Sequence, residues 1–128
     1  MTPATPSTTT SLLERLGGLH DASRLRLLVL LDSHELAVGE LAAAIQTPQS
    51  TVSRHLKRLV DSGWVQRRSV GPQSLYRMTT TSLEPKARQL WEIAASCLND
   101  DPTHTEDLRR VGEILAQRRI DSQTFFGS

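Results

Sequence analysis

The stretch TPQSTVSRHLKRLVDSG, residues 47–63, carries the strongest structural signal in the chain. Thr47 is suited to cap a helix, Pro48 favours the first helical position, and Gly63 favours the position after the last turn. At about 100° per residue, the apolar side chains gather on one side of this helix, which holds Val52, Leu56, Leu59 and Val60. The sequence therefore predicts an amphipathic helix over residues 48–62, with its other side turned away from the core.

The polar side of this helix has the composition of a helix that reads DNA. It combines an amide, short hydroxyls and long cations, from Gln49, Ser50, Thr51, Ser53, Arg54, Lys57 and Arg58. Arginine can bind guanine and glutamine can bind adenine through paired hydrogen bonds, and the free N–H groups at a helix start attract phosphate. An ordinary solvated face is the alternative, but such a face usually intersperses acids with bases, and this segment has one acid, Asp61. His55 is expected to pack half-buried, with a phosphate contact as the alternative.

Helices are also expected before this segment, over residues 11–18, 22–33 and 38–45. The evidence is leucines at helical spacing and Asp21 as an N-cap. Arg24 and Arg26 in the second of these helices are expected to point away from the core. Only a few residues join the third helix to the helix over residues 48–62, which is typical of a helix-turn-helix.

After Gly63 the pattern changes to that of extended chain. Residues 64–70 and 75–79 are strand-like runs on either side of the turn sequence GPQS, which predicts a β-hairpin. Its apolar side chains are expected to pack on the core, and its polar side chains are expected to face outward, namely Arg67, Arg68, Gln73, Ser74 and Arg77. Such a hairpin can place cations along the phosphate backbone or in the minor groove. An ordinary surface hairpin is the alternative.

Two more helices are expected towards the C-terminus. TSLE at residues 81–84 matches a capping box before a long helix that ends near residue 98. THTE at residues 103–106 repeats this pattern before a last helix through about residue 118. The predicted fold is mainly α with a small β-hairpin. It comprises a disordered arm (1–10), a winged helix-turn-helix domain (11–98), and a C-terminal helix and tail (99–128) that is a candidate connector to a further domain.

Composition and charge limit the classes of function. The chain has 128 residues, of which 38% are hydrophobic, and no apolar run approaches the roughly 18 residues of a membrane span. No export signal is seen, so a cytoplasmic protein without a membrane partner is expected. Residues 47–77 hold six Lys/Arg and one acid, which gives +5, whereas the rest of the chain sums to −4 within a net charge of +1. A basic block in an otherwise acidic protein indicates a site for a polyanion.

Catalytic, metal and cofactor sites are not expected. The sequence has no nucleophile elbow, phosphate loop or metal-binding histidine pair. Cys97 is the one cysteine and cannot supply the several thiolates of a soft-metal site. It is expected to pack as a small hydrophobe, with redox sensing as the alternative.

Four segments of the chain, DASRLRLL (21–28), ELAVGELA (35–42), QSTVSRHLK (49–57) and GWV (63–65), resemble the ArsR-type winged-helix repressors. The resemblance covers about residues 11–98. It implies a homodimer that binds a palindromic operator in double-stranded DNA, with the first and the long fifth helices at the dimer interface. It also implies that Gln49, Ser50, Ser53 and Arg54 lie closest to the base edges.

One departure from this family pattern bears on the signal that the protein senses. Metal-sensing members carry cysteines in the helix that here reads ELAVGELA, or Asp/His/Glu clusters on the fifth helix, where residues 84–98 contain no histidine. The resemblance therefore implies a member that does not sense metals and whose inducer is unknown.

Two alternatives to a stand-alone regulator stay open. Residues 107–126 are similar to the connector of proteins that fuse an ArsR-type domain to an S-adenosylmethionine-dependent methyltransferase, so the chain could be the regulatory half of such a fusion. The other alternative is a winged helix that binds a partner protein instead of DNA.

Overall fold

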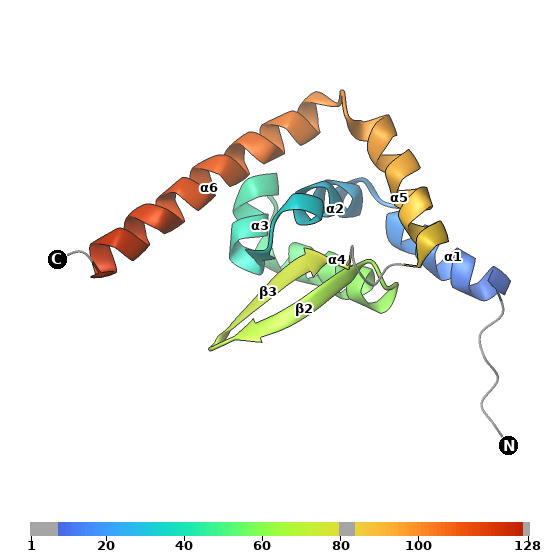
Figure 1. The fold of residues 1–128 in the computed structure, drawn as a ribbon, viewed down its shortest axis with the longest axis horizontal. Helices are drawn as coiled ribbons and strands as arrows, with labels where there is room; N and C mark the ends of the chain where they lie inside the picture. The colour runs from blue at the N-terminus through green and yellow to red at the C-terminus, as the bar shows by residue number, and fades with distance from the viewer. Residues whose placement is uncertain (1–7, 80–83, 127–128) are drawn as a thin grey trace, which may run out of the picture.

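The computed structural model describes residues 8–79 and 84–126. The described elements follow in the order α1 (Thr8–Leu19), α2 (Ala22–Ser33), β1 (Leu36–Ala37), α3 (Val38–Ile45), α4 (Gln49–Asp61), β2 (Val65–Val70), β3 (Gln73–Met78), α5 (Pro85–Leu98) and α6 (Pro102–Phe126). Helices α5 and α6 meet at an angle above α2 and α3, and the hairpin of β2 and β3 projects on the other side (Figure 1). Among the helices of this described part, none is long and apolar enough to cross a bilayer.

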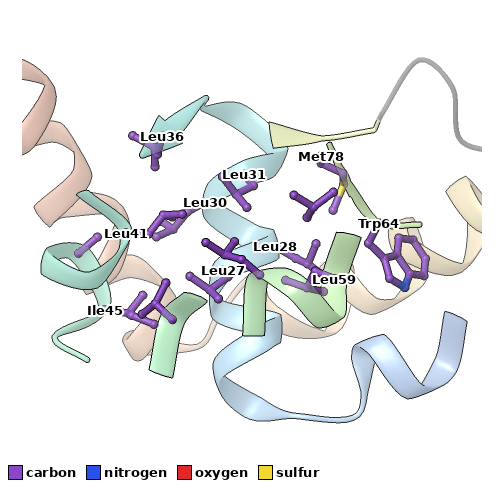
Figure 2. Close-up of a cluster of buried hydrophobic side chains, with 14 of the residues drawn as sticks. Leu27, Leu28, Leu30, Leu31, Leu36, Leu41, Ile45, Leu59, Trp64 and Met78 are labelled. Atoms are coloured by element: carbon purple, nitrogen blue, oxygen red, sulfur yellow. The ribbon is translucent and has the colours of Figure 1, made fainter. Parts of the chain in front are cut away.

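The hydrophobic core forms around α2, the most leucine-rich helix. Its four core leucines lie between side chains of α3 on one side and side chains of α4 and the sheet on the other (Figure 2). These leucines are Leu27, Leu28, Leu30 and Leu31, each at most 2% exposed. Because burying a large aliphatic side chain contributes about 1.5–3 kcal/mol, this cluster supplies much of the driving force for folding.

The sheet has three antiparallel strands in the order β1-β3-β2. The predicted hairpin is confirmed, with Val65 opposite Met78 at its base and Val70 opposite Gln73 at its tip. Gly71 adopts a positive φ of 59° in the turn, a conformation that glycine reaches without strain. The sequence did not predict β1, because two residues are too few to show a strand period.

The helix that follows the turn at residues 46–48 begins one residue later than predicted. Pro48 is the N-cap of α4, and its carbonyl oxygen accepts from the N–H groups of Thr51 and Val52 at 3.1 Å. The Thr47 hydroxyl does not cap α4 and donates instead to the carbonyl oxygen of Ile45 at 3.2 Å. The predicted Thr47 cap is therefore wrong, although the helix itself is confirmed.

Helix α1 also differs from its prediction, since it begins at Thr8 and so includes residues 8–10 of the predicted arm. The rest of that arm, residues 1–7, lies outside the described residues, as do residues 81–83 of the first predicted capping box.

The prediction that Arg24 and Arg26 point away from the core is wrong. The Arg24 guanidinium donates to the carbonyl oxygens of Gly17 and Gly18 at 3.0 and 2.8 Å, so it caps the end of α1. Arg26 reaches across to Asp107 on α6. The carbonyls at a helix C-terminus lack partners within the helix, and a cation there is favourable.

Helix α6 is longer than predicted and packs on the helical core. It begins at Pro102, where the Asp101 carboxylate accepts from the N–H of Thr103 at 2.8 Å, so the THTE box does not start it. It continues to Phe126, past the predicted end near residue 118. Val111 is fully buried in the same core as α2. Residues beyond α5 therefore contribute to the packed body of the protein.

Candidate nucleic-acid interface

Helix α4 exposes one polar face, as its pattern predicted. Val52, Leu56 and Leu59 are fully buried, as predicted. Val60 is 36% exposed, so it does not belong to the buried side on which the sequence placed it. Thr51 is half-buried, and the other predicted contact residues of this helix are exposed, namely Gln49, Ser50, Ser53, Arg54, Lys57 and Arg58. The hydroxyl and guanidinium groups at the centre of this face are accessible to a macromolecule.

The start of α4 is held against α3. The Gln49 side chain lies over Gly39 of α3, where a Cβ atom would be 3.2 Å from Gln49 Nε2, a slightly tight contact that a small shift of this side chain would relieve. No side chain caps the N-terminus of α4, since its N-cap is Pro48. The N–H groups of Gln49 and Ser50, which precede the Thr51 N–H bonded to Pro48, are therefore available to a phosphate oxygen.

The cations of α4 differ in their surroundings. Arg54 Nη2 lies 3.5 Å from the Thr51 hydroxyl, and Lys57 Nζ pairs with Asp61 at 3.0 Å with both side chains largely exposed. Exposed pairs of this kind are weak and can exchange partners readily. Arg58 turns towards α1, since a Cβ atom at Gly17 would lie 2.8 Å from its Nη2. Arg58 is therefore set apart from the Ser53–Arg54 face.

His55 is half-buried where α4 lies against the start of α2. Its Nδ1 lies 3.4 Å from Arg24 Nη1 and 3.9 Å from the Asp21 carboxylate. The Arg24 N–H, the Asp21 carboxylate and the low exposure of the ring favour the packing interpretation over the phosphate contact.

The arginines of the hairpin lie on both faces of the sheet, whereas the sequence analysis expected all of them to face outward as one group. Arg67 pairs in register with Tyr76, and its Nε donates to the Ser74 hydroxyl at 2.9 Å. Arg77 pairs with Gln66, and Arg68 with Leu75, so these two arginines lie on the opposite face. Gln73 lies on this opposite face too, at the tip of the hairpin.

Arg68 has an acidic partner that the sequence did not predict. Its guanidinium donates two hydrogen bonds to the carboxylate of Glu35, which lies just before β1. This hydrogen-bonded guanidinium lowers the pKa of Glu35 below its ordinary value. Glu35 therefore stays ionised at neutral pH and competes with any phosphate for Arg68. The sequence contains no local indication of this ion pair, because Glu35 and Arg68 are 33 positions apart.

Two further predictions concern metal ligands and the single cysteine. In residues 8–79 and 84–126, no group of three or more His, Cys, Asp or Glu side chains could hold a metal ion. Cys97 is exposed on α5, so the prediction that it packs as a small hydrophobe is wrong within the single chain.

Comparison with known proteins identifies the helix-turn-helix region. Residues 21–67 match the family described as "Bacterial regulatory protein, arsR family". The arsenical resistance operon repressor of Staphylococcus xylosus is 38% identical over 66 residues, which cover 52% of this chain and 64% of that protein. The transcriptional activator HlyU of Vibrio cholerae is 34% identical over 61 residues, which cover 48% of this chain and 56% of that protein. The chain thus spans less than two thirds of the length of these two curated relatives.

A solved structure extends the likeness to most of the fold. The crystal structure of the transcriptional repressor BigR from Xylella fastidiosa is similar with a TM-score of 0.58 and 33% identity, over 73% of this chain and 90% of that chain. This agreement confirms the winged helix-turn-helix arrangement expected from the sequence. The chain belongs to the ArsR family of bacterial regulatory proteins.

Proposed function

We propose that this chain is a sequence-specific DNA-binding transcriptional regulator that acts as a homodimer and represses its target genes. The observation that carries the proposal is the exposed face of α4, which combines an amide, hydroxyls and a guanidinium beside an exposed basic hairpin. Regulators of this kind read DNA with the second helix of the helix-turn-helix in the major groove. Such a protein acts in the cytoplasm, where the DNA is.

The proposed contacts fall into two classes. Base edges are read by Gln49, Ser50, Ser53 and Arg54, which occupy the exposed face and N-terminal end of α4. Phosphates are bound by the remaining polar side chains of α4 and of the hairpin, namely Thr51, Lys57, Arg58, Arg67, Arg68, Gln73, Ser74 and Arg77. The first class selects the operator, and the second positions the protein on any duplex.

The dimer is proposed from apolar side chains that the single chain leaves exposed. Leu12, Leu13 and Leu16 of α1 are 51%, 61% and 40% exposed, and Ile93 of α5 is 65% exposed. Both helices lie at one end of the molecule, and the C-terminal end of α6 lies at the other (Figure 1). A two-fold dimer through α1 and α5 would present two α4 helices to half-sites about 34 Å apart.

Repression is proposed over activation because two of the compared proteins are described as repressors, against one described as an activator. A reporter gene placed behind the operator tests the sign, since expression should rise when the regulator gene is deleted. No catalytic role is proposed for any residue of the chain.

Selection of bound sites from random DNA duplexes tests the function. The expected result is enrichment of an inverted repeat whose half-sites are one helical turn apart. A chain that retains no duplex in the selection or in a gel shift would instead fit the partner-binding winged helix, and the proposal would be wrong.

The salt dependence of DNA binding is expected to be steep. The basic face suggests on the order of 6–10 phosphate contacts per dimer, which predicts a slope of log K against log salt between about −5 and −9. Titration of operator binding by fluorescence anisotropy at several salt concentrations measures this slope. A nearly flat response would contradict a phosphate-binding face.

Arg54→Ala and Arg67→Ala are expected to act differently. Loss of Arg54 should cost about 1–3 kcal/mol of operator binding and relax the base preference at one position, because arginine reads bases from α4. Loss of Arg67 should weaken operator and random duplexes alike. Competition gel shifts with both DNAs separate the two outcomes, and equal losses for both variants on both DNAs would contradict the assigned roles.

Glu35→Gln is expected to strengthen binding to all duplexes several-fold. The substitution removes the carboxylate that holds Arg68, and the released guanidinium can bind phosphate, so the salt slope should steepen by about 1 per subunit. Glu113→Gln is the matched control, because that exposed acid pairs with Arg109 on α6, outside the proposed interface. Equal effects of the two variants would mean that only net charge had changed.

A further inference from the structure

The C-terminal half of α6 is bound to the first helix of the helix-turn-helix. Helix α6 passes beside α3 (Figure 1), and there the Arg118 guanidinium binds the Glu40 carboxylate of α3. Arg118 Nε donates to Glu40 Oε2 at 3.0 Å, and its Nη2 donates to Oε1 and Oε2 at 2.6 and 2.7 Å. The Glu40 side chain is only 21% exposed. An arginine that binds both oxygens of a carboxylate is more directional than an ordinary surface pair, so Arg118 fixes the orientation of the Glu40 side chain.

The same carboxylate closes the first turn of α3. Its Oε1 accepts from the N–H of Ala37, the N-cap of this helix, at 2.9 Å. An alanine side chain has no oxygen with which to cap the helix, so the Glu40 carboxylate provides the hydrogen bond that a capping box places at a helix start. The oxygen that closes this turn is also one of the two that Arg118 binds. The start of α3 is therefore held by a side chain that α6 holds in turn.

This turn of α3 lies next to two sets of proposed DNA contacts. Gly39 directly precedes Glu40, and the Gln49 side chain lies over it, since a Cβ atom at Gly39 would be 3.2 Å from Gln49 Nε2. Gly39 and Glu40 also line a hollow of about 500 Å³ together with Gln73 and Ser74 of the hairpin tip. A shift of the turn would therefore move the surface on which the Gln49 amide lies.

We infer that Arg118 is a positioning residue for base recognition: by holding Glu40 it fixes the α3 turn beneath the Gln49 amide, and so sharpens the base preference at the operator position that Gln49 reads. The inference rests on the proposed function. A glutamine amide selects adenine through two hydrogen bonds, and both form only when the amide is correctly oriented. Arg118 acts in this way without touching the DNA.

A direct phosphate contact is the other role that an arginine at this place could have. Such a contact adds affinity for every duplex and steepens the salt dependence, whereas a positioning residue changes the preference at one base pair. The guanidinium of Arg118 already binds both oxygens of Glu40, which favours positioning. The two roles differ in what they do to the ratio of operator affinity to the affinity for a singly altered operator.

Competition gel shifts with the selected operator and with duplexes altered at one base pair each measure this ratio. Gln49→Ala first identifies the base pair that Gln49 reads. We expect Arg118→Ala to lower the discrimination at that base pair by about threefold or more, and to leave the discrimination at the other base pairs unchanged. Arg119→Ala is the matched control, because it removes the neighbouring exposed guanidinium of α6 and leaves the Arg118–Glu40 pair intact. A loss of charge alone affects all duplexes equally and cancels in the ratio.

Two further variants test whether the effect passes through Gln49. In the Gln49→Ala background, Arg118→Ala should cause no further loss of discrimination, because the side chain that it positions is absent. Arg118→Lys should retain part of the discrimination, since an ammonium group still pairs with Glu40 but cannot bind both of its oxygens in the planar geometry of a guanidinium. The Arg118 side chain is 48% exposed, so these variants are expected to fold.

NMR spectroscopy tests the same coupling without DNA. In Arg118→Ala the backbone amide of Ala37 should exchange its hydrogen faster, because its acceptor Glu40 is no longer held, and the side-chain amide signal of Gln49 should shift. Arg119→Ala should change neither signal.

The outcomes separate this inference from the proposed function. An equal loss on all duplexes, a further loss of discrimination in the Gln49→Ala background, or the same change in Arg119→Ala would overturn the positioning role. A Gln49→Ala variant with unchanged base preferences would overturn it too, and would leave the proposed function to Arg54 and the hydroxyls of α4. A chain that binds no duplex would refute the proposed function, and the Ala37 and Gln49 signals would then decide whether Arg118 holds the start of α3.

Discussion

Asp107→Asn is expected to lower the free energy of unfolding by about 3–5 kcal/mol, because it removes the paired carboxylate of the partly buried Arg26 and the nearer of the two acids beside Arg110. Asp107 is 1% exposed. Its carboxylate accepts from Arg26 Nε and Nη2 at 2.8 Å each, and from Arg110 Nη1 at 3.2 Å. The Asp107 carboxylate also raises the pKa of Arg26 above its ordinary value, so the arginine keeps its charge at every working pH.

Arg26 of α2 and Arg110 of α6 also both cap the end of α3, which adds to the expected loss. Arg26 Nη2 donates to the carbonyl oxygen of Ile45, and Arg110 Nη1 donates to that of Ala44, both at 3.1 Å. These carbonyls belong to the last turn of α3 and lack partners within the helix. Asp107 orients both guanidinium groups for this capping. Asparagine has one carbonyl oxygen and no charge, so it cannot satisfy both arginines.

Urea denaturation followed by circular dichroism measures the effect on stability. Glu113→Gln is the matched control, because Glu113 is an acid of the same helix that pairs with Arg109 largely in solvent and contacts neither Arg26 nor Arg110. The control should change stability little, since exposed ion pairs contribute little. If the two variants destabilised the chain equally, the buried ion pair would not be what holds α6 in place.

Leu13→Glu is expected to convert the dimer to a monomer and to weaken operator binding by about two to four orders of magnitude. Leu13 is 61% exposed in the single chain, so the substitution leaves the core of each subunit intact. Two half-sites bound by one dimer gain from effective concentration, and a monomer loses that gain. A charge buried without a partner in the dimer interface opposes association.

Analytical ultracentrifugation and gel shifts test this expectation together. Ile120→Glu is the matched control, because Ile120 is 53% exposed on α6 and lies outside the proposed interface. The control should stay dimeric and bind the operator as the unmodified chain does. A Leu13→Glu variant that still sediments as a dimer would place the interface elsewhere.

Much of the fold follows from periodicities that the sequence displays locally. The 3.6-residue pattern predicted α4 together with its buried and exposed sides, and the strand-like runs around Gly71 predicted the hairpin. The sequence shows these patterns because each element buries one face. Buried positions therefore recur every two residues in a strand and every three or four residues in a helix. The exposure of Ser50, Ser53 and Arg54 therefore follows from the sequence alone.

Contacts between distant segments could not be read in this way. The arginines of α2 carry no local mark of a partner, and Arg26 meets an acid 81 residues later only because α6 folds back over α2 and α3. The position of Glu35 beside Arg68 depends likewise on the pairing of β1 with β3. An ion pair depends on where three-dimensional packing brings two charges, whereas a helical face depends on spacing alone. The sequence was therefore sufficient for α4 and its exposed polar face, and the folded chain was needed to show how α6 is attached and which hairpin arginine is already engaged.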